Sequence, residues 1–201
     1  MTNLKLDWCS HDAARYACET WHYSECVPAG RTVKIGVWED GEFVGVVIYT
    51  PGASPWLATP FDGVTPNQVA ELARVALDDH ETPTSKILSI SQKLLKRNSP
   101  KLRILISFAD PKPGHDGTLY QASNWYYVGR AKSNTDIRIG DELKHERSVG
   151  GKYGTSSVKK LKQMLNVRPI ERVRRPNKYK YVYPLDDEIE AKVKGMSKPY
   201  P

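Results

Sequence analysis

The sequence has no apolar run long enough to cross a membrane and no pattern that directs secretion. None of its apolar stretches reaches the roughly 18 residues that a membrane-spanning helix requires. Residues 1–8 lack the basic start and the apolar stretch of a signal peptide. We therefore expect a protein of the cytoplasm that has no membrane as its partner.

Cysteine is scarce too, and its pattern excludes two classes of small protein. The chain has three cysteines, Cys9, Cys18 and Cys26, and an odd number argues against a disulfide framework. Their spacing is not that of a zinc ribbon, and no HxxxH, CxxC or facial-triad spacing joins the histidines and acids. We expect reduced cysteines that serve in packing, and the sequence leaves the need for a metal open.

Positive charge is what the chain has in excess, and it is concentrated in one segment. The net charge is +7 over 201 residues, and residues 144–180 hold 12 Lys and Arg against two acids. Such a surface displaces counterions from phosphates, which favours nucleic acid as the partner over a solvated face or an anionic membrane. The residues expected to contact phosphates are Lys152, Lys159, Lys160, Lys162, Arg172, Arg174, Arg175, Lys178 and Lys180.

Hydrophobic periodicity predicts helices and strands that alternate within one domain of residues 1–201. Ser10 can cap the first helix, and Asp40-Gly41 between two β-rich runs is a strong hairpin signal. The expected helices are 11–22, 85–97, 117–123 and a short 158–165, and the expected strands are 32–38, 42–50, 72–77, 101–108, 125–131 and 179–183.

Two further segments, residues 51–66 and 68–77, lie between the hairpin and the second helix. Residues 68–77 fit a helix or a half-buried strand, and we choose a strand from about Leu72 because a helix follows so soon. Residues 51–66 hold four prolines and two glycines, which predicts a loop.

The segment of residues 107–129 is the best candidate for chemistry. It follows an apolar strand and places Asp110, His115 and Tyr120 within one loop and one helical turn. Polar and titratable residues at the end of a strand are typical of sites in open α/β sheets. The alternative is a surface loop followed by a buried aromatic helix.

The order of elements resembles the GNAT acyltransferase fold. Many of its members carry Leu-Tyr-x-x-x-Gly-Phe before the sixth strand, and Leu119–Trp125 is similar, with Asn124-Trp125 in place of Gly-Phe. A larger set is more specific, and over roughly residues 10–184 it resembles the Mom family of bacteriophage DNA-modification proteins. Its members, in chain order, are residues 21–24, 71–75, 107–110, 114–125 and 178–182.

The resemblance implies both a fold and a function. The fold would be α/β (α+β), a GNAT-like mixed twisted sheet flanked by helices, with a basic DNA-binding insertion at about 136–177 before the last strand. Mom proteins convert adenine in double-stranded DNA to N6-carbamoylmethyladenine, which shields phage DNA from host restriction. The expected location is then the cytoplasm of the infected bacterium.

Three side chains are candidates for catalysis. Tyr120 would act as a proton donor or oxyanion partner, and its alternative is a buried structural tyrosine. Asp110 would accept the N6 proton or bond the base edge, unless it is only the residue of an Asp-Pro turn. His22 is a third candidate, although capping or packing is its usual role. Residues expected to bind substrate or donor are Arg74, Ser85, Lys86, Ser107, His115 and Asn124.

The donor is open to two interpretations. Acetyl-coenzyme-A users of the GNAT superfamily hold the pyrophosphate on a Gln/Arg-x-x-Gly-x-Gly/Ala loop at a helix N-terminus. Residues 78–86 stand at this position and contain no glycine. We therefore favour a glycyl donor such as glycyl-tRNA, which would make a tRNA a further partner. The alternatives are an acetyltransferase that acts on another amine and a DNA-binding protein without catalysis.

Overall fold

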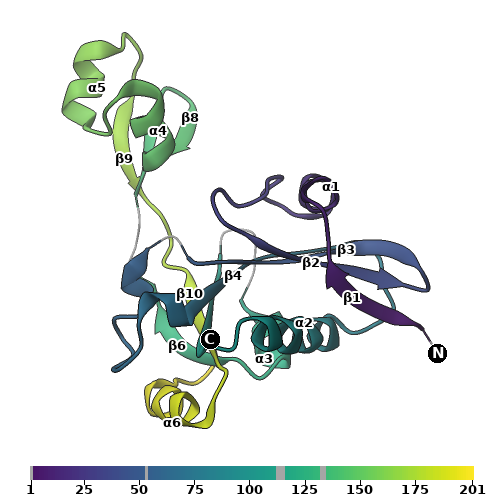
Figure 1. Ribbon diagram of the computed structural model, residues 1–201. Helices are drawn as coiled ribbons and strands as arrows, with labels where there is room; N and C mark the ends of the chain where they lie inside the picture. Colours follow the sequence, from purple (N-terminus) through teal and green to yellow (C-terminus); the bar gives the residue numbers. More distant parts are fainter. Residues whose placement is uncertain (1, 53, 112–115, 132–134) are drawn as a thin grey trace. The chain divides into compact units, whose positions relative to one another are not determined.

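The computed structural model describes residues 2–52, 54–111, 116–131 and 135–201, and the chain divides into two compact units (Figure 1). The first unit consists of Met1–Ala109, Asp116–Gly129 and Tyr179–Pro201, and the second of Asp110–His115 and Arg130–Lys178. The second unit lies where the basic insertion is predicted in the sequence.

A seven-stranded sheet forms the centre of the first unit, in the order β1-β2-β3-β4-β5-β10-β6. Neighbours from β1 to β4 are antiparallel, β4 and β5 are parallel, and β10 runs antiparallel to β5. The strands are β1 (Leu4–Trp8), β2 (Val33–Glu39), β3 (Glu42–Thr50), β4 (Val69–Leu77), β5 (Ile104–Ala109), β6 (Tyr126–Arg130) and β10 (Tyr179–Pro184).

Helices cover both faces of this sheet. The helices are α1 (His11–Trp21), α2 (Thr84–Asn98), α3 (Thr118–Ala122) and α6 (Asp187–Met196), with two 3-10 turns at Pro55–Leu57 and Pro66–Gln68. On one face α1 buries Ala14, Ala17 and Cys18 against β3 and β4. On the other, α2 packs Ile87 and Leu88 against the main core. The mixed sheet and its flanking helices confirm the predicted GNAT-like α/β fold.

Local signals in the sequence explain the first of these elements. The Ser10 hydroxyl accepts a hydrogen bond from the Ala13 amide at 3.1 Å, as expected of the cap of α1. Asp40 and Gly41 both have positive φ, 50° and 91°, which is the requirement of the tight turn between β2 and β3. Both predictions are confirmed, and β4 is a strand that begins at Val69, three residues earlier than expected.

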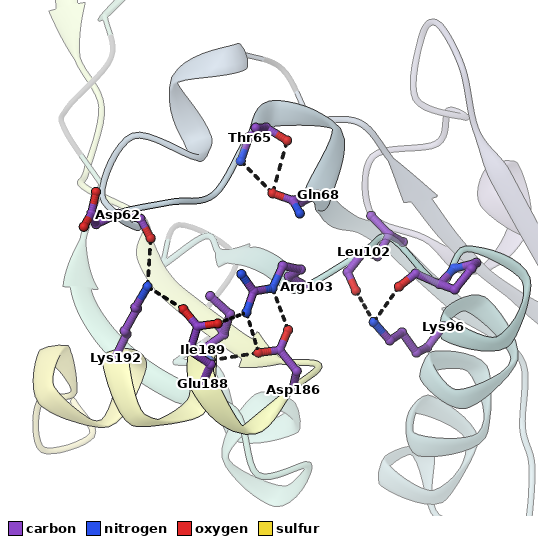
Figure 2. Close-up of polar contacts among 11 residues, drawn as sticks. Asp62, Thr65, Gln68, Lys96, Leu102, Arg103, Asp186, Glu188, Ile189 and Lys192 are labelled. Atoms are coloured by element: carbon purple, nitrogen blue, oxygen red, sulfur yellow. Dashed lines mark hydrogen bonds and ion pairs between the residues drawn. The ribbon is translucent and has the colours of Figure 1, made fainter.

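Strand β1 and helix α6 were not predicted from the sequence, and α6 is held by a cluster of ion pairs (Figure 2). Asp186 caps the helix by accepting from the Ile189 amide at 3.0 Å, and its carboxylate binds Arg103 at 2.8 and 2.9 Å. Arg103 also donates to Glu188 at 2.8 Å, and Lys192 donates to the carbonyl of Asp62 at 2.9 Å. These contacts fasten α6 to the start of β5 and to the loop before β4.

The second unit has a sheet and an apolar cluster of its own. Its elements are β7 (Thr135–Ile139), β8 (Glu142–His145), α4 (Glu146–Tyr153), α5 (Val158–Met164) and β9 (Ile170–Arg174), with the strand order β8-β7-β9. Ile137, Val149, Leu161 and Ile170 are buried together. Only α5 of these elements is predicted in the sequence analysis, and the others were missed because basic residues interrupt their apolar pattern.

Candidate functional site

The site is built where two parallel strands separate. Strands β4 and β5 pair over three residues each, and their last pair joins Glu71 and Ile106. Beyond this pair β4 continues beside β3, and β5 continues beside β10. The carbonyl of Leu72 accepts instead from the Ser107 hydroxyl at 2.8 Å. The Ser107 side chain therefore makes the hydrogen bond that a backbone amide of β5 would make if the two strands were still paired.

Tyr120 on α3 extends this connection. Its phenolic oxygen lies 2.7 Å from Ser107 Oγ. A serine has one proton and a carbonyl can only accept. Both contacts are therefore made when Ser107 donates to Leu72 and Tyr120 donates to Ser107. Conversely, if Tyr120 gives its proton to another group, Ser107 can turn and donate to the resulting phenolate.

The surroundings of Tyr120 keep its phenol protonated. Burial raises the pKa of Tyr120 to about 12, the hydrogen bond with Ser107 works in the opposite direction, and the nearby Tyr23 and Glu71 add to the rise. At neutral pH the group can therefore donate a hydrogen bond or a proton, whereas it cannot act as a base.

Aromatic packing fixes the Tyr120 ring. Tyr181 stacks on it with ring centres 4.9 Å apart, and the fully buried Trp125 lies at 5.3 Å. Tyr181 in turn donates to the carbonyl of Asp116 at 2.7 Å. Gly117 is the N-cap residue before α3 and has a φ of 92°, and a Cβ there would lie 2.3 Å from the Tyr181 ring. Only glycine fits this position without moving the aromatic stack.

Asn124 stands where GNAT proteins often have glycine. It is exposed, and its φ of 60° lies in the left-handed region that asparagine tolerates better than most residues. This conformation explains how Asn124-Trp125 replaces Gly-Phe between α3 and β6. A role of Asn124 in binding substrate stays a prediction.

His22 ends α1 and contacts its own loop. Its Nδ1 lies 2.8 Å from the Ser24 hydroxyl and accepts from the Ser24 amide at 3.1 Å. Its ring stacks on Tyr23 with centres 4.4 Å apart. Nδ1 is thus an acceptor, which leaves Nε2 as the nitrogen that carries the proton. A catalytic role for His22 stays a prediction.

Arg74 lies in β4 and is half-buried. Its guanidinium donates to the carbonyl of Cys26 at 3.2 Å and to that of Ala73 at 2.7 Å. These contacts tie β4 to the loop that follows α1. The anionic partner predicted for Arg74 stays a prediction.

The remaining members of the predicted catalytic loop belong to the second unit. Asp110 forms an ion pair with Lys178 at 3.0 Å. The pair joins a predicted catalytic residue to a predicted DNA-binding residue. His115 lies outside the described residues.

The connection between β4 and α2 carries the predicted donor residues Ser85 and Lys86 at the start of the helix, and Lys86 is exposed. Just before them, the amides of Glu81 and Thr82 both donate to the Glu39 carboxylate at 2.9 Å. Glu39 belongs to β2 and is 7% exposed. These two backbone amides of the connection are thus hydrogen-bonded to a carboxylate of the chain itself.

The predicted DNA-binding residues differ in exposure and in contacts. The exposed ones are Lys152, Lys159, Lys160, Lys162, Arg172 and Arg174. Arg172, Arg175, Lys178 and Lys180 contact acids or an aromatic ring of the protein. Arg172 pairs with Glu146 at 2.9 Å and Arg175 with Asp136, which is 3% exposed.

Lys180 contacts an aromatic ring of the protein. It is half-buried over the Phe61 ring, with its Nζ 5.4 Å from the ring centre. Burial lowers the pKa of its ammonium group. Its stem therefore packs as an apolar surface.

Glu71 and Tyr23 are further site residues that were not predicted from the sequence. Both influence the pKa of Tyr120, and Glu71 is the last residue of β4 that pairs with β5. Both lie inside motifs of the family resemblance, at residues 71–75 and 21–24. Their membership in these motifs was the signal that could have identified them.

Among the described residues, no three His, Cys, Asp or Glu side chains come close enough to hold a metal ion. No helix in this part of the chain is long and apolar enough to span a membrane. The cysteines within this part of the chain are unpaired, and burial raises the pKa of Cys9 to about 11.

The strand order, the separation of β4 from β5 and the half-buried tyrosine beside it define a GNAT-like protein. The Mom protein family model matches residues 3–201. The chain therefore belongs to the Mom protein family. It is 28% identical over 159 residues to the protein named methylcarbamoylase mom of Escherichia phage Mu, which covers 75% of this chain and 66% of that protein. The matched part is thus slightly less than two thirds of the length of this relative.

Similar solved structures share little sequence with the chain. One is FeeM, an N-acyl amino acid synthase from uncultured soil microbes, with a TM-score of 0.47 and 14% identity over 98% of this chain and 94% of that one. Another is aminoglycoside acetyltransferase AAC(6')-Ib in complex with coenzyme A, with a TM-score of 0.47 and 12% identity over 64% and 87%. The fold assignment rests on the strand order described above.

Proposed function

We propose that this protein is an acyltransferase-like enzyme that modifies phage DNA by converting adenine to N6-carbamoylmethyladenine, which protects the DNA from restriction. The observation that carries the proposal is a protonated tyrosine where β4 and β5 separate, in a chain that matches the Mom family over residues 3–201. The name of its relative from phage Mu supports this reaction.

The residues of the first unit suggest how the chemistry is divided. The target base must leave the stack or lie in a single strand before N6 can react. Tyr120 then donates a proton to the leaving group or a hydrogen bond to the developing oxyanion, and Ser107 stabilises the phenolate. Within this unit Glu71 joins His22 as a candidate to accept the N6 proton, because its charge acts on Tyr120. The role predicted for Asp110 stays a separate prediction, since Asp110 belongs to the second unit.

A glycyl ester such as glycyl-tRNA is the proposed donor. N6 attacks the ester carbonyl, the carbon–oxygen bond to the carrier breaks, and an amide forms on N6. The glycyl amine next attacks C6 through a five-membered ring, and the bond from C6 to the original N6 breaks. The original N6 becomes the terminal amide of the carbamoylmethyl group. Both steps conserve electrons and require only proton transfers.

Double-stranded DNA is the proposed partner of the second unit. The lysines of α5 are exposed, and exposed cations gain most from phosphates when no acid of the protein competes for them. The bases themselves would be read by other residues, since phosphate contacts carry no sequence information.

Expression in a bacterium, followed by mass spectrometry of the DNA nucleosides, tests the reaction. We expect carbamoylmethyl-deoxyadenosine with the wild-type protein and its loss with Tyr120→Phe. Unmodified DNA in cells with soluble protein would contradict the proposal, and an acetylated small amine or bound but unmodified DNA would point to the two alternatives.

Labelled glycine tests the donor separately. Glycine carrying carbon-13 and nitrogen-15 should give a base with both carbons and with the labelled nitrogen bonded to C6. Fragmentation that removes the terminal amide should therefore retain the nitrogen label on the purine. Absence of glycine carbon from the product would exclude this donor and leave the modification itself standing.

A further inference from the structure

The connection between β4 and α2 binds a carboxylate of its own chain. The amides of Glu81 and Thr82 donate to the two oxygens of Glu39, each at 2.9 Å. The side chain of Thr82 is a third donor and is the main reason why the pKa of Glu39 lies below its usual value. Glu39 and Thr82 are both buried. Three donors around one buried carboxylate form a complete anion site.

The position of Glu39 is set by strands on both sides. Glu39 pairs with Leu4 of β1 and with Glu42 across the hairpin. Glu81 is tied to the same region because its carboxylate accepts from the Thr2 hydroxyl at 2.6 Å. The loop is thus attached to the sheet at two points, and its amides point toward β2.

Few donors remain at the start of α2. Pro83 precedes the helix and has no N–H group. The Lys86 amide donates to the Pro83 carbonyl at 2.8 Å, and the Thr84 hydroxyl lies 3.0 Å from the His80 ring. Within the described residues, the amides of Thr84 and Ser85 are left as donors at the helix start, and those of Asp79 and His80 are left in the connection before it. The two amides at the helix start suit one small anionic group.

Two effects weaken the binding of a free anion to this connection, namely the negative charge around it and competition from Glu39. Three acids, Asp78, Asp79 and Glu81, lie in the connection itself, and Glu39 adds a fourth negative charge. A free ligand must also displace a carboxylate that belongs to the same chain, and such a tethered group acts at an effective concentration of roughly millimolar or more. A diffusing pyrophosphate would therefore bind here only weakly.

We infer that the connection between β4 and α2 does not hold the pyrophosphate of a coenzyme A donor, because Glu39 is the anion that its amides bind. The donor class that fits is an acyl group activated without a pyrophosphate at this position. The inference narrows the donor of the proposed reaction, and its test measures binding without using that reaction.

Nuclear magnetic resonance of the full chain gives the direct test. We titrate the nitrogen-15-labelled protein with coenzyme A and, separately, with inorganic pyrophosphate, and follow the amides of Glu81, Thr82, Thr84 and Ser85. The expected result is unchanged shifts for Glu81 and Thr82 up to millimolar ligand. Saturable shifts of these two amides at micromolar coenzyme A would overturn the inference.

Two variants show whether Glu39 is responsible. Glu39→Gln removes the charge and one acceptor, and we expect the amides of residues 81 and 82 to exchange at least about tenfold faster with solvent. Glu42→Gln is the matched control, because Glu42 lies in the same hairpin and is exposed. Equal exchange rates in both variants would show that Glu39 does not occupy these amides. The wild-type titration decides the question even if Glu39→Gln folds poorly.

Discussion

The two units differ in where their charged groups lie. In the first, a buried anion, Glu39, is satisfied by amides of the protein, and the central tyrosine is kept neutral. In the second, some cations are neutralised by acids, as in the pair of Arg172 and Glu146, whereas the lysines of α5 face solvent. Residues of equal charge in the sequence can thus have different roles. Some form ion pairs within the protein and others can bind a partner, and only the contacts in the structure distinguish them.

The largest effect is expected from Tyr120→Phe. The ring still fills its place against Tyr181 and Trp125, so folding and DNA binding should persist while the proton is lost. General acid help is worth about 100- to 10,000-fold, and modification measured by nucleoside mass spectrometry should fall by that factor. Near-normal modification would leave Tyr120 as a packing residue and transfer the chemistry to other groups.

The second effect concerns the lysines of α5. Replacing Lys159, Lys160 and Lys162 by Ala should weaken DNA binding. The slope of log affinity against log salt should fall by about 0.9 for each phosphate that the variant no longer neutralises. The slope is measured by fluorescence anisotropy on a duplex. The matched control removes three exposed charges from the first unit, at Lys93, Arg97 and Lys101.

An equal reduction of slope in both triple variants would remove the distinction between the units. Arg172 is a poorer choice for this test, because its replacement also leaves Glu146 without its partner. A change in affinity at Arg172 would therefore mix folding with binding.

A third effect isolates the packing that supports Tyr120. Gly117→Ala should destabilise the protein by about 2–4 kcal/mol, since the new Cβ meets the Tyr181 ring and the backbone is left-handed. Gly63→Ala is the control, because Gly63 also has positive φ but has nothing within 4 Å of the added atom. Denaturant unfolding measures both, and equal destabilisation would show that the ring contact costs nothing.

The smallest effect is the acid response of Glu39. Its pKa is lowered in the folded state, so its stabilisation is present above the unfolded pKa of about 4.3 and is lost as pH falls through the folded value. Glu39→Gln should therefore lower the free energy of unfolding by about 1–3 kcal/mol at neutral pH. Below about pH 4.5 the unfolding free energy of this variant should depend less on pH than that of the wild type. Parallel curves of unfolding free energy against pH for variant and wild type would contradict this.

Local chemistry decided which parts of the fold could be predicted. The turn at Asp40-Gly41 was identifiable because both residues must adopt positive φ, and Tyr120 was identifiable from the motif around it. The start of α6 also has a local signal, since Asp186 caps the helix and acids follow in its first turn.

The contacts that were missed join distant residues. Glu39 meets the amide of Glu81, 42 residues away, and no local pattern encodes such a pair. Glu71 lies where β4 and β5 separate. The position of this point depends on the whole sheet and not on the residues around Glu71. Likewise, the ion pair of Arg175 with Asp136 forms between β7 and the end of β9, so the sequence showed a basic cluster and not its partner.

The ends of the long segment of the second unit lie together, since the amide of Ala131 donates to the carbonyl of Lys178 at 2.8 Å. A segment that leaves and returns at neighbouring points can be exchanged in evolution or in the laboratory with little disturbance to its host. Grafts of this segment between relatives, joined at residues 131 and 178, would therefore test whether the segment carries the proposed DNA binding while the same sheet is retained.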